Sequence, residues 1–221
     1  MSAKPAFAED LRTVQNPVQE DDALPTEVEP VVLRFAPILQ RLQDDDFFLF
    51  CQLNEQWKLE LSKEGDLIIM MPSGGETGRR NAKLTRLLGN WAEADGTGEC
   101  FDSSTGFILP NGAERAPDAA WVKKERWEAL TKIERRRFAP LCPDFVIELR
   151  SYTDRLKPLQ TKMEEYLENG AQLGWLIDPI KHKVYIYRPN RSVECLERPA
   201  ELSGENVLPG FVLPVARLWQ D

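Results

Sequence analysis

Glu148 is a carboxylate in the middle of a predicted strand, where a charged side chain needs a specific partner. Residues 144–150 alternate so that Val146, Glu148 and Arg150 share one face of this strand. An ionised carboxylate inside a sheet is costly unless it pairs with a cation or binds a metal. We therefore expect Glu148 either to form an ion pair with an arginine or to ligate a divalent cation.

Asp118 is the predicted partner of Glu148 in such a metal site. It follows Pro117 at the start of a short apolar strand, residues 119–122, although a Pro-Asp pair also starts turns. A second Pro-Asp pair contains Asp144, which lies on the same strand as Glu148. At about 3.3 Å per residue, the Cα atoms of Asp144 and Glu148 are roughly 13 Å apart, which is too far to share one ion. Asp118 lies on a different strand, so Asp118 and Glu148 are the predicted ligands of Mg²⁺.

Two further residues are candidates for the same site. Glu76 opens a predicted helix at residues 76–94 and is a candidate third carboxylate, although an acidic residue there also complements the helix dipole. Lys162 borders the apolar stripe of a predicted helix at residues 158–169, from which a basic side chain could reach the strand ends. The alternative for Lys162 is a surface lysine whose stem covers apolar neighbours.

The charge of the chain is unevenly distributed. The net charge is −8, and residues 1–46, with ten acidic and four basic side chains, carry −6 of it. The overall field therefore does not favour phosphate, and nucleic-acid binding requires a local basic patch. Residues 123–137 hold seven basic and three acidic side chains. This segment either contacts phosphates or is a solvated charged face.

The pattern of elements indicates an α/β (α+β) fold, with a mixed central sheet flanked by at least two helices. We expect an N-terminal arm over residues 1–30 and a single domain over residues 31–221. The periodicity predicts helices at 76–94 and 158–169, a charged helix or helix and loop at 123–137, and an apolar tail at 208–218. It predicts strands at 57–61, 66–71, 99–103, 106–109, 119–122, 144–150, 175–179, 183–188 and 192–197. The strands at 99–103 and 106–109 fit a meander.

Composition excludes several other classes of protein. No apolar run approaches the roughly 20 residues that span a bilayer, and the N-terminus has no secretory pattern, so the cytoplasm is the expected location. The four cysteines are widely spaced and His182 is the only histidine, which argues against a structural zinc site. We expect the cysteines to be apolar filler.

Five stretches, taken together, resemble the Uma-two family of restriction endonucleases of the cyanobacterial type, within the PD-(D/E)XK nuclease superfamily. The resemblance spans roughly residues 45–220. The stretches are residues 76–81 (ETGRRN), 101–107 (FDSSTGF), 117–122 (PDAAWV), 143–151 (PDFVIELRS) and 174–179 (GWLIDP).

This resemblance implies a restriction-endonuclease-like fold and a Mg²⁺- or Mn²⁺-dependent hydrolase that cleaves DNA, acting as a two-fold homodimer. It assigns metal binding and catalysis to Asp118 and Glu148, with Glu76 assisting. The superfamily places a lysine two residues after the second acidic residue, where this chain has Arg150. An arginine stays charged and cannot act as a base. The family resemblance therefore makes Lys162, on the next helix, the expected substitute.

Two other functions are compatible with the sequence. One is a catalytically inactive, nuclease-like binding or assembly protein, which the nearly neutral body of the chain and Arg150 would suit. The other is a nuclease-like fold that acts on a different phosphorylated substrate, because a fold alone does not fix function.

Overall fold

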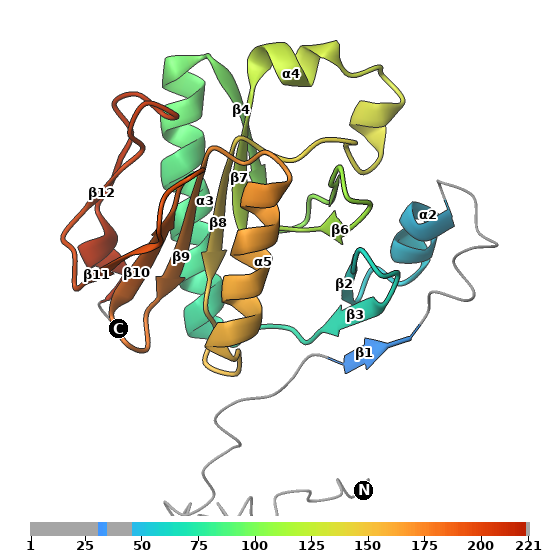
Figure 1. Cartoon of the computed structure of the whole chain (residues 1–221), viewed down its shortest axis with the longest axis horizontal. Helices are drawn as coiled ribbons and strands as arrows, with labels where there is room; N and C mark the ends of the chain where they lie inside the picture. The colour runs from blue at the N-terminus through green and yellow to red at the C-terminus, as the bar shows by residue number, and fades with distance from the viewer. Residues whose placement is uncertain (1–30, 35–45, 220–221) are drawn as a thin grey trace, which may run out of the picture.

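A six-stranded mixed sheet forms the centre of the molecule (Figure 1). The structure is a computed structural model, and it describes residues 31–34 and 46–219. Strands β8 and β9 are parallel, and the other neighbours in this sheet are antiparallel. In spatial order the strands are β11 (Glu194–Glu197), β10 (Lys183–Tyr187), β9 (Leu173–Asp178), β8 (Phe145–Leu149), β7 (Ala119–Lys123) and β4 (Gly98–Asp102).

One long helix covers each face of this sheet (Figure 1). Helix α3 (Gly75–Asp95) buries Leu84 and Leu88 against the face that carries Phe145 and Ile147 of β8. Helix α5 (Leu156–Glu168) buries Met163 and Tyr166 against the opposite face, which carries Val146. The alternation along β8 therefore separates two cores, as expected for a strand buried on both faces.

A second sheet of five strands lies beside the first. Its order is β1 (Val31–Leu33), β3 (Leu67–Met70), β2 (Lys58–Leu61), β6 (Glu114–Arg115) and β5 (Phe107–Ile108). Helix α2 (Asp46–Leu53) packs on it through Phe47, which meets Leu59 and Leu67 in a third apolar cluster. Strand β6 leads through residues 116–118 into β7, so this short connection joins the two sheets.

The remaining elements are short. They are α4 (Lys124–Ala129), the 3₁₀ turns η1 (Glu134–Arg136) and η2 (Val215–Leu218), and the pair β12 (Leu202–Ser203) and β13 (Val212–Leu213). The C-terminal segment packs on α3, where Arg80 Nε donates to the Leu218 carbonyl at 2.9 Å and Lys83 Nζ to the Arg217 carbonyl at 2.9 Å. These basic side chains of α3 therefore hold the tail in place.

The predicted α/β class and its flanking helices are confirmed, but the predicted meander at 99–103 and 106–109 is wrong. Strand β4 pairs with β7, while β5 pairs with β6 in the other sheet. The turn after β4 separates them, and β6 has two residues, too few to give a periodic signal. Residues 1–30, the predicted arm, lie outside the described residues, and the single domain stays a prediction. Within the described residues, no helix combines the length and apolar character that a bilayer crossing requires.

Gly98 allows β4 to approach β7 closely, and this position gives a stability test. A Cβ added there would collide with the Trp121 ring and the Val122 carbonyl oxygen. We expect Gly98→Ala to lower the free energy of unfolding by about 1–3 kcal/mol, measured by urea denaturation. The matched control is Gly89→Ala on α3, whose Cβ would meet only Cys100 Sγ at 3.9 Å and which should be neutral or stabilising. Equal effects of the two variants would contradict this packing.

Candidate metal site

The register of β7 and β8 brings Asp118 and Glu148 together. Ala119 pairs with Ile147, so Asp118, one residue before β7, lies beside Glu148 on the neighbouring strand. The backbone N–H of Leu149 donates to Asp118 Oδ2 at 2.8 Å, which fixes the aspartate at this strand end. Both carboxylates line a cavity of about 830 Å³ between α5, the β2–β3 hairpin and the start of α3. The cavity is of the size that ligand sites usually have.

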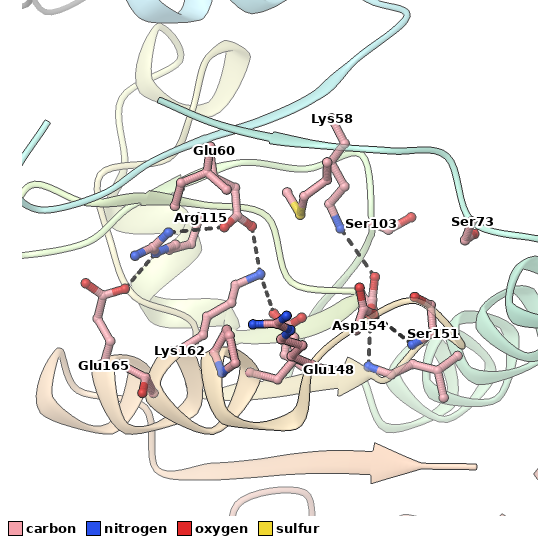
Figure 2. Close-up of a pocket in the computed structure, with 18 of the residues that line it drawn as sticks. Lys58, Glu60, Ser73, Ser103, Arg115, Glu148, Ser151, Asp154, Lys162 and Glu165 are labelled. Atoms are coloured by element: carbon pink, nitrogen blue, oxygen red, sulfur yellow. Dashed lines mark hydrogen bonds and ion pairs between the residues drawn. The ribbon is translucent and has the colours of Figure 1, made fainter. Parts of the chain in front are cut away.

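Lys162 of α5 reaches into this cavity and contacts two carboxylates (Figure 2). Its Nζ lies 2.8 Å from Glu148 Oε1 and 2.7 Å from Glu60 Oε1. Tyr166, one turn further along α5, donates its hydroxyl to Glu148 Oε1 at 3.1 Å. The helix therefore orients Glu148 through two side chains four residues apart, on one face.

Glu60 is a residue of this site that the sequence reasoning missed. It lies on β2, is 2% exposed, and accepts hydrogen bonds from Lys162, from Arg115 Nη1 at 3.2 Å and from the Ala116 N–H at 3.0 Å. Arg115 continues the chain of charges, with its Nε 2.6 Å from Glu165 Oε2 (Figure 2). The available signal was the alternation in residues 58–61 (KLEL), which places a glutamate on the polar face of a half-buried strand.

Burial and charge act in opposite directions on these groups. Burial alone would raise the pKa of Glu60, but Lys162 and Arg115 lower it to about 2. Burial raises the pKa of Glu148 to about 7; the Asp118 carboxylate adds to the rise and Lys162 opposes it. Burial alone would lower the pKa of Lys162, but Glu148 and Glu60 raise it, so the lysine stays charged. Glu148 and Glu60 together thus keep Lys162 an ammonium.

A second lysine approaches the other carboxylate. Lys58 of β2 places its Nζ 3.3 Å from Asp118 Oδ1, and both side chains are partly exposed to the cavity. The hairpin that carries Glu60 therefore also supplies a cation to Asp118. Lys58 was not predicted, because an exposed lysine on a hairpin gives no signal of its own.

Arg150, which stands where the superfamily has its lysine, has a structural role. Its Nη1 lies 3.0 Å from Asp178 Oδ2, and its Nε donates to the Asp154 carbonyl at 2.9 Å. Asp154 in turn accepts the Ser151 N–H at 2.8 Å. Arg150 thus holds the loop after β8 in place, and the cation that lies against Glu148 from α5 is Lys162.

Glu76, the residue predicted at the start of α3, is not among the residues that line the cavity. Glu76 has a side chain that is 62% exposed and pairs with Arg80 at 3.3 Å. Thr77 and Asn81, one turn apart, line the cavity instead. Within the described part of the chain, Asn81 Oδ1 is buried without a hydrogen-bond partner. The assisting role of Glu76 stays a prediction.

Asp144, which strand spacing excluded as a partner of Glu148, holds the start of β8 in place. Its Oδ2 accepts the Lys123 N–H at 2.9 Å and lies 2.9 Å from Arg126 Nη1. Arg135, in the same basic segment, donates to the Leu130 carbonyl at 3.1 Å. Part of the segment at residues 123–137 therefore stabilises its own fold.

The donor set at the strand ends fits a hard divalent cation. Across residues 31–34 and 46–219, no group of three or more histidine, cysteine or acidic side chains forms a cage for a metal. Mg²⁺ in proteins commonly takes only one or two carboxylates, with waters and substrate phosphates as the other ligands. When Glu148 is ionised, the charges of the site sum to −1, so the site can accept a cation; they are Asp118, Glu148, Glu60, Glu165, Lys58, Lys162 and Arg115.

Comparison with known proteins gives a family and a fold. A family model named Uma2, described as "Putative restriction endonuclease", matches residues 44–216. A crystal structure from Anabaena variabilis ATCC 29413, described as a "putative nuclease", has a TM-score of 0.65 at 17% identity, and the match covers 83% of this chain and 96% of that one. No curated protein matches the chain.

The Glu60 carboxylate gives a test of the charge network. Because its pKa is lowered to about 2, the stabilisation is complete above the unfolded value near 4.5 and is lost as the pH falls toward 2. We expect Glu60→Gln to lower the free energy of unfolding at pH 7 by roughly 3 kcal/mol, measured by urea denaturation. The difference from the unmodified chain should shrink between pH 5 and pH 3.

Glu76→Gln is the control for this test, because its exposed ion pair should contribute less than about 1 kcal/mol. A Glu60→Gln chain that is as stable as the Glu76→Gln chain at pH 7 would show that the network does not stabilise the fold.

Proposed function

Since the chain belongs to the Uma2 family of restriction endonucleases, we propose that it is a metal-dependent endonuclease that hydrolyses phosphodiester bonds in DNA. The observation that carries this proposal is the pairing of Asp118 and Glu148 at adjoining strand ends, with the Lys162 ammonium 2.8 Å from Glu148. Two carboxylates and a charged lysine around one cavity are the groups that phosphoryl hydrolysis uses.

Asp118 and Glu148 would hold Mg²⁺ or Mn²⁺. The bound ion would supply a Lewis acid and a water that ionises near neutral pH. Leu149 fixes Asp118 through its N–H, and Tyr166 fixes Glu148 through its hydroxyl. The protein thus provides two oxygen ligands whose positions are already set before the ion arrives.

Lys162 acts as a fixed positive charge in this proposal. Glu60 and Glu148 raise its pKa, so it donates hydrogen bonds and does not accept protons. Its position against Glu148 would let it stabilise the negative charge that develops on the phosphoryl oxygens. Glu60 is then a positioning residue, which holds the ammonium in place from the opposite side.

Charged side chains of both signs line the cavity. The basic ones include Lys58 and Lys63 of the hairpin, Arg155 of the loop after β8 and Lys157 of α5, and the acidic ones include Glu64, Asp154, Glu164 and Glu168. The lining is therefore not a cationic patch, and in this proposal a bound divalent ion would supply the positive charge that attracts phosphate.

The proposal includes two features of the family resemblance, a two-fold homodimer and a part for Glu76 in assisting the metal site. It also includes the location in the cytoplasm that the composition indicates. A catalytically inactive binding protein is the other candidate. The ion pairs of Lys162 with Glu60 and Glu148 favour it, because these two carboxylates already neutralise the lysine's charge.

Removing either metal ligand separates these two candidates. We expect Asp118→Asn and Glu148→Gln each to reduce Mn²⁺-dependent cleavage of plasmid DNA by at least about 100-fold, because each removes a charged ligand. Nicking is followed by gel electrophoresis. The control is Glu197→Gln, an exposed residue of β11 that pairs with Lys183 and should cleave normally. Undiminished cleavage by both site variants would rule out the proposed metal pair.

Lys162→Met tests whether the lysine acts on the reaction or on metal binding. We expect cleavage to fall by about 100-fold or more, because a charge that stabilises the transition state is lost. Mn²⁺ affinity, measured by calorimetry, should be unchanged or tighter, because the ammonium no longer competes for Glu148. A weaker affinity for Mn²⁺ would contradict this division of roles.

A further inference from the structure

A second cavity, of about 430 Å³, adjoins the proposed metal site. Its walls come from the end of α2 and the turn after it, from β6, and from Phe138. The two cavities share lining residues, namely Lys58, Met70, Pro72, Ser103 and Arg115. They are therefore neighbouring parts of one hollow, and a single extended ligand could occupy both.

Glu114 lines the second cavity, and one of its carboxyl oxygens lacks a hydrogen-bond partner among the described residues. Strand alternation on β6 turns Arg115 toward Glu60 and leaves Glu114 on the other face. Among the described residues, Glu114 Oε2 is buried with no hydrogen-bond partner. Burial raises the pKa of this carboxyl to about 7. A buried acceptor left unpaired is costly, so rotation of the carboxyl group toward the cavity, where a ligand supplies an N–H donor, would relieve this cost.

Aromatic side chains border the same cavity. Trp57, which follows α2, lines the cavity while remaining 41% exposed, and Phe138 lines it from another segment. A flat π surface beside a polar hydrogen-bonding group is the combination that proteins use to hold a nucleobase outside the base stack. A second carboxylate, Glu55, also lines the cavity and disfavours an anionic ligand here.

The distance to the metal site suits one nucleotide. Glu114 lies four residues before Asp118, so their Cα atoms are at most about 13 Å apart. Lys58 lines both cavities, and its ammonium lies 3.3 Å from Asp118 Oδ1. A phosphate at Asp118 and Glu148 would thus have a cation beside it and the base cavity next to it.

We propose that the second cavity binds an unstacked nucleobase of the strand whose phosphate lies at Asp118 and Glu148. Glu114 accepts a hydrogen bond from an N–H of the base, and Trp57 stacks on its face. This inference rests on the proposed function, and it narrows the substrate class. The preferred DNA is single-stranded, or has an unpaired base, because a base within a duplex cannot enter the cavity without leaving the stack.

The test measures binding without cleavage, using the full chain in EDTA. Two fluorescein-labelled single-stranded oligonucleotides are compared by fluorescence anisotropy, one with a central adenine and one with an abasic site there. We expect the adenine to tighten binding by about 10-fold, since stacking of one base contributes about 1–3 kcal/mol. Trp57→Ala and Glu114→Gln should each reduce this preference for the base. Tyr152→Ala, an exposed aromatic residue, is the control that should keep it.

The outcomes separate the base cavity from the proposed function. Equal affinity for the two oligonucleotides, or an unchanged preference in both Trp57→Ala and Glu114→Gln, would overturn the base cavity. A parallel Mn²⁺ cleavage assay on the same oligonucleotides tests the nuclease. Base-dependent binding without cleavage would contradict the proposed nuclease function and support the base cavity. Absence of any binding in EDTA together with absence of any cleavage in Mn²⁺ would overturn both. Displacement of the oligonucleotide by an oligolysine peptide from the unmodified chain, but not from Glu114→Gln, would assign the cavity to a basic peptide instead.

Discussion

The contact of one lysine with two carboxylates from different layers is the interaction on which the site depends. Lys162 comes from the helix on one face of the central sheet, Glu148 from the sheet, and Glu60 from the neighbouring hairpin. The ammonium is buried, so it needs both carboxylates to offset its loss of hydration. The same contact ties the small sheet to the large one beside it. The position of the β2–β3 hairpin and the chemistry of the cavity are therefore set together.

The short connection between the two sheets also couples the site to the packing of the small sheet. Residues 116–118 join β6 to β7, so Asp118 stands at the point where the chain leaves one sheet and enters the other. On the β6 side of this connection, Arg115 holds Glu60, and on the β7 side Asp118 accepts the Leu149 N–H. A displacement of the hairpin would move Lys58 away from Asp118 and Glu60 away from Lys162 at once. The site is thus sensitive to the packing of a sheet that contributes no proposed metal ligand.

The residues of the candidate site that could be predicted from the sequence are those whose charge is unusual for their position in an apolar strand or at its end. Glu148 was found because a carboxylate within an apolar strand is costly, and Asp118 because strand spacing rejected Asp144. Glu60 gave a similar signal in a shorter alternating strand and was overlooked. Lys58 and Asn81 gave none, because a lysine on a hairpin and an asparagine on a helix are ordinary surface residues. The long helices were predicted from their periodicity, whereas the two-residue strands β5 and β6, and the sheet that they join, depend on tertiary pairing.

In the function proposed for this chain, Asp118 and Glu148 form a divalent-metal site beside Lys162. The most direct measurement is a crystal structure of the full chain soaked in Mn²⁺, with the ion located by its anomalous scattering. We expect one manganese in contact with carboxylate oxygens of both Asp118 and Glu148, while the ammonium of Lys162 stays against Glu60. A manganese bound elsewhere, or none at millimolar Mn²⁺, would contradict it.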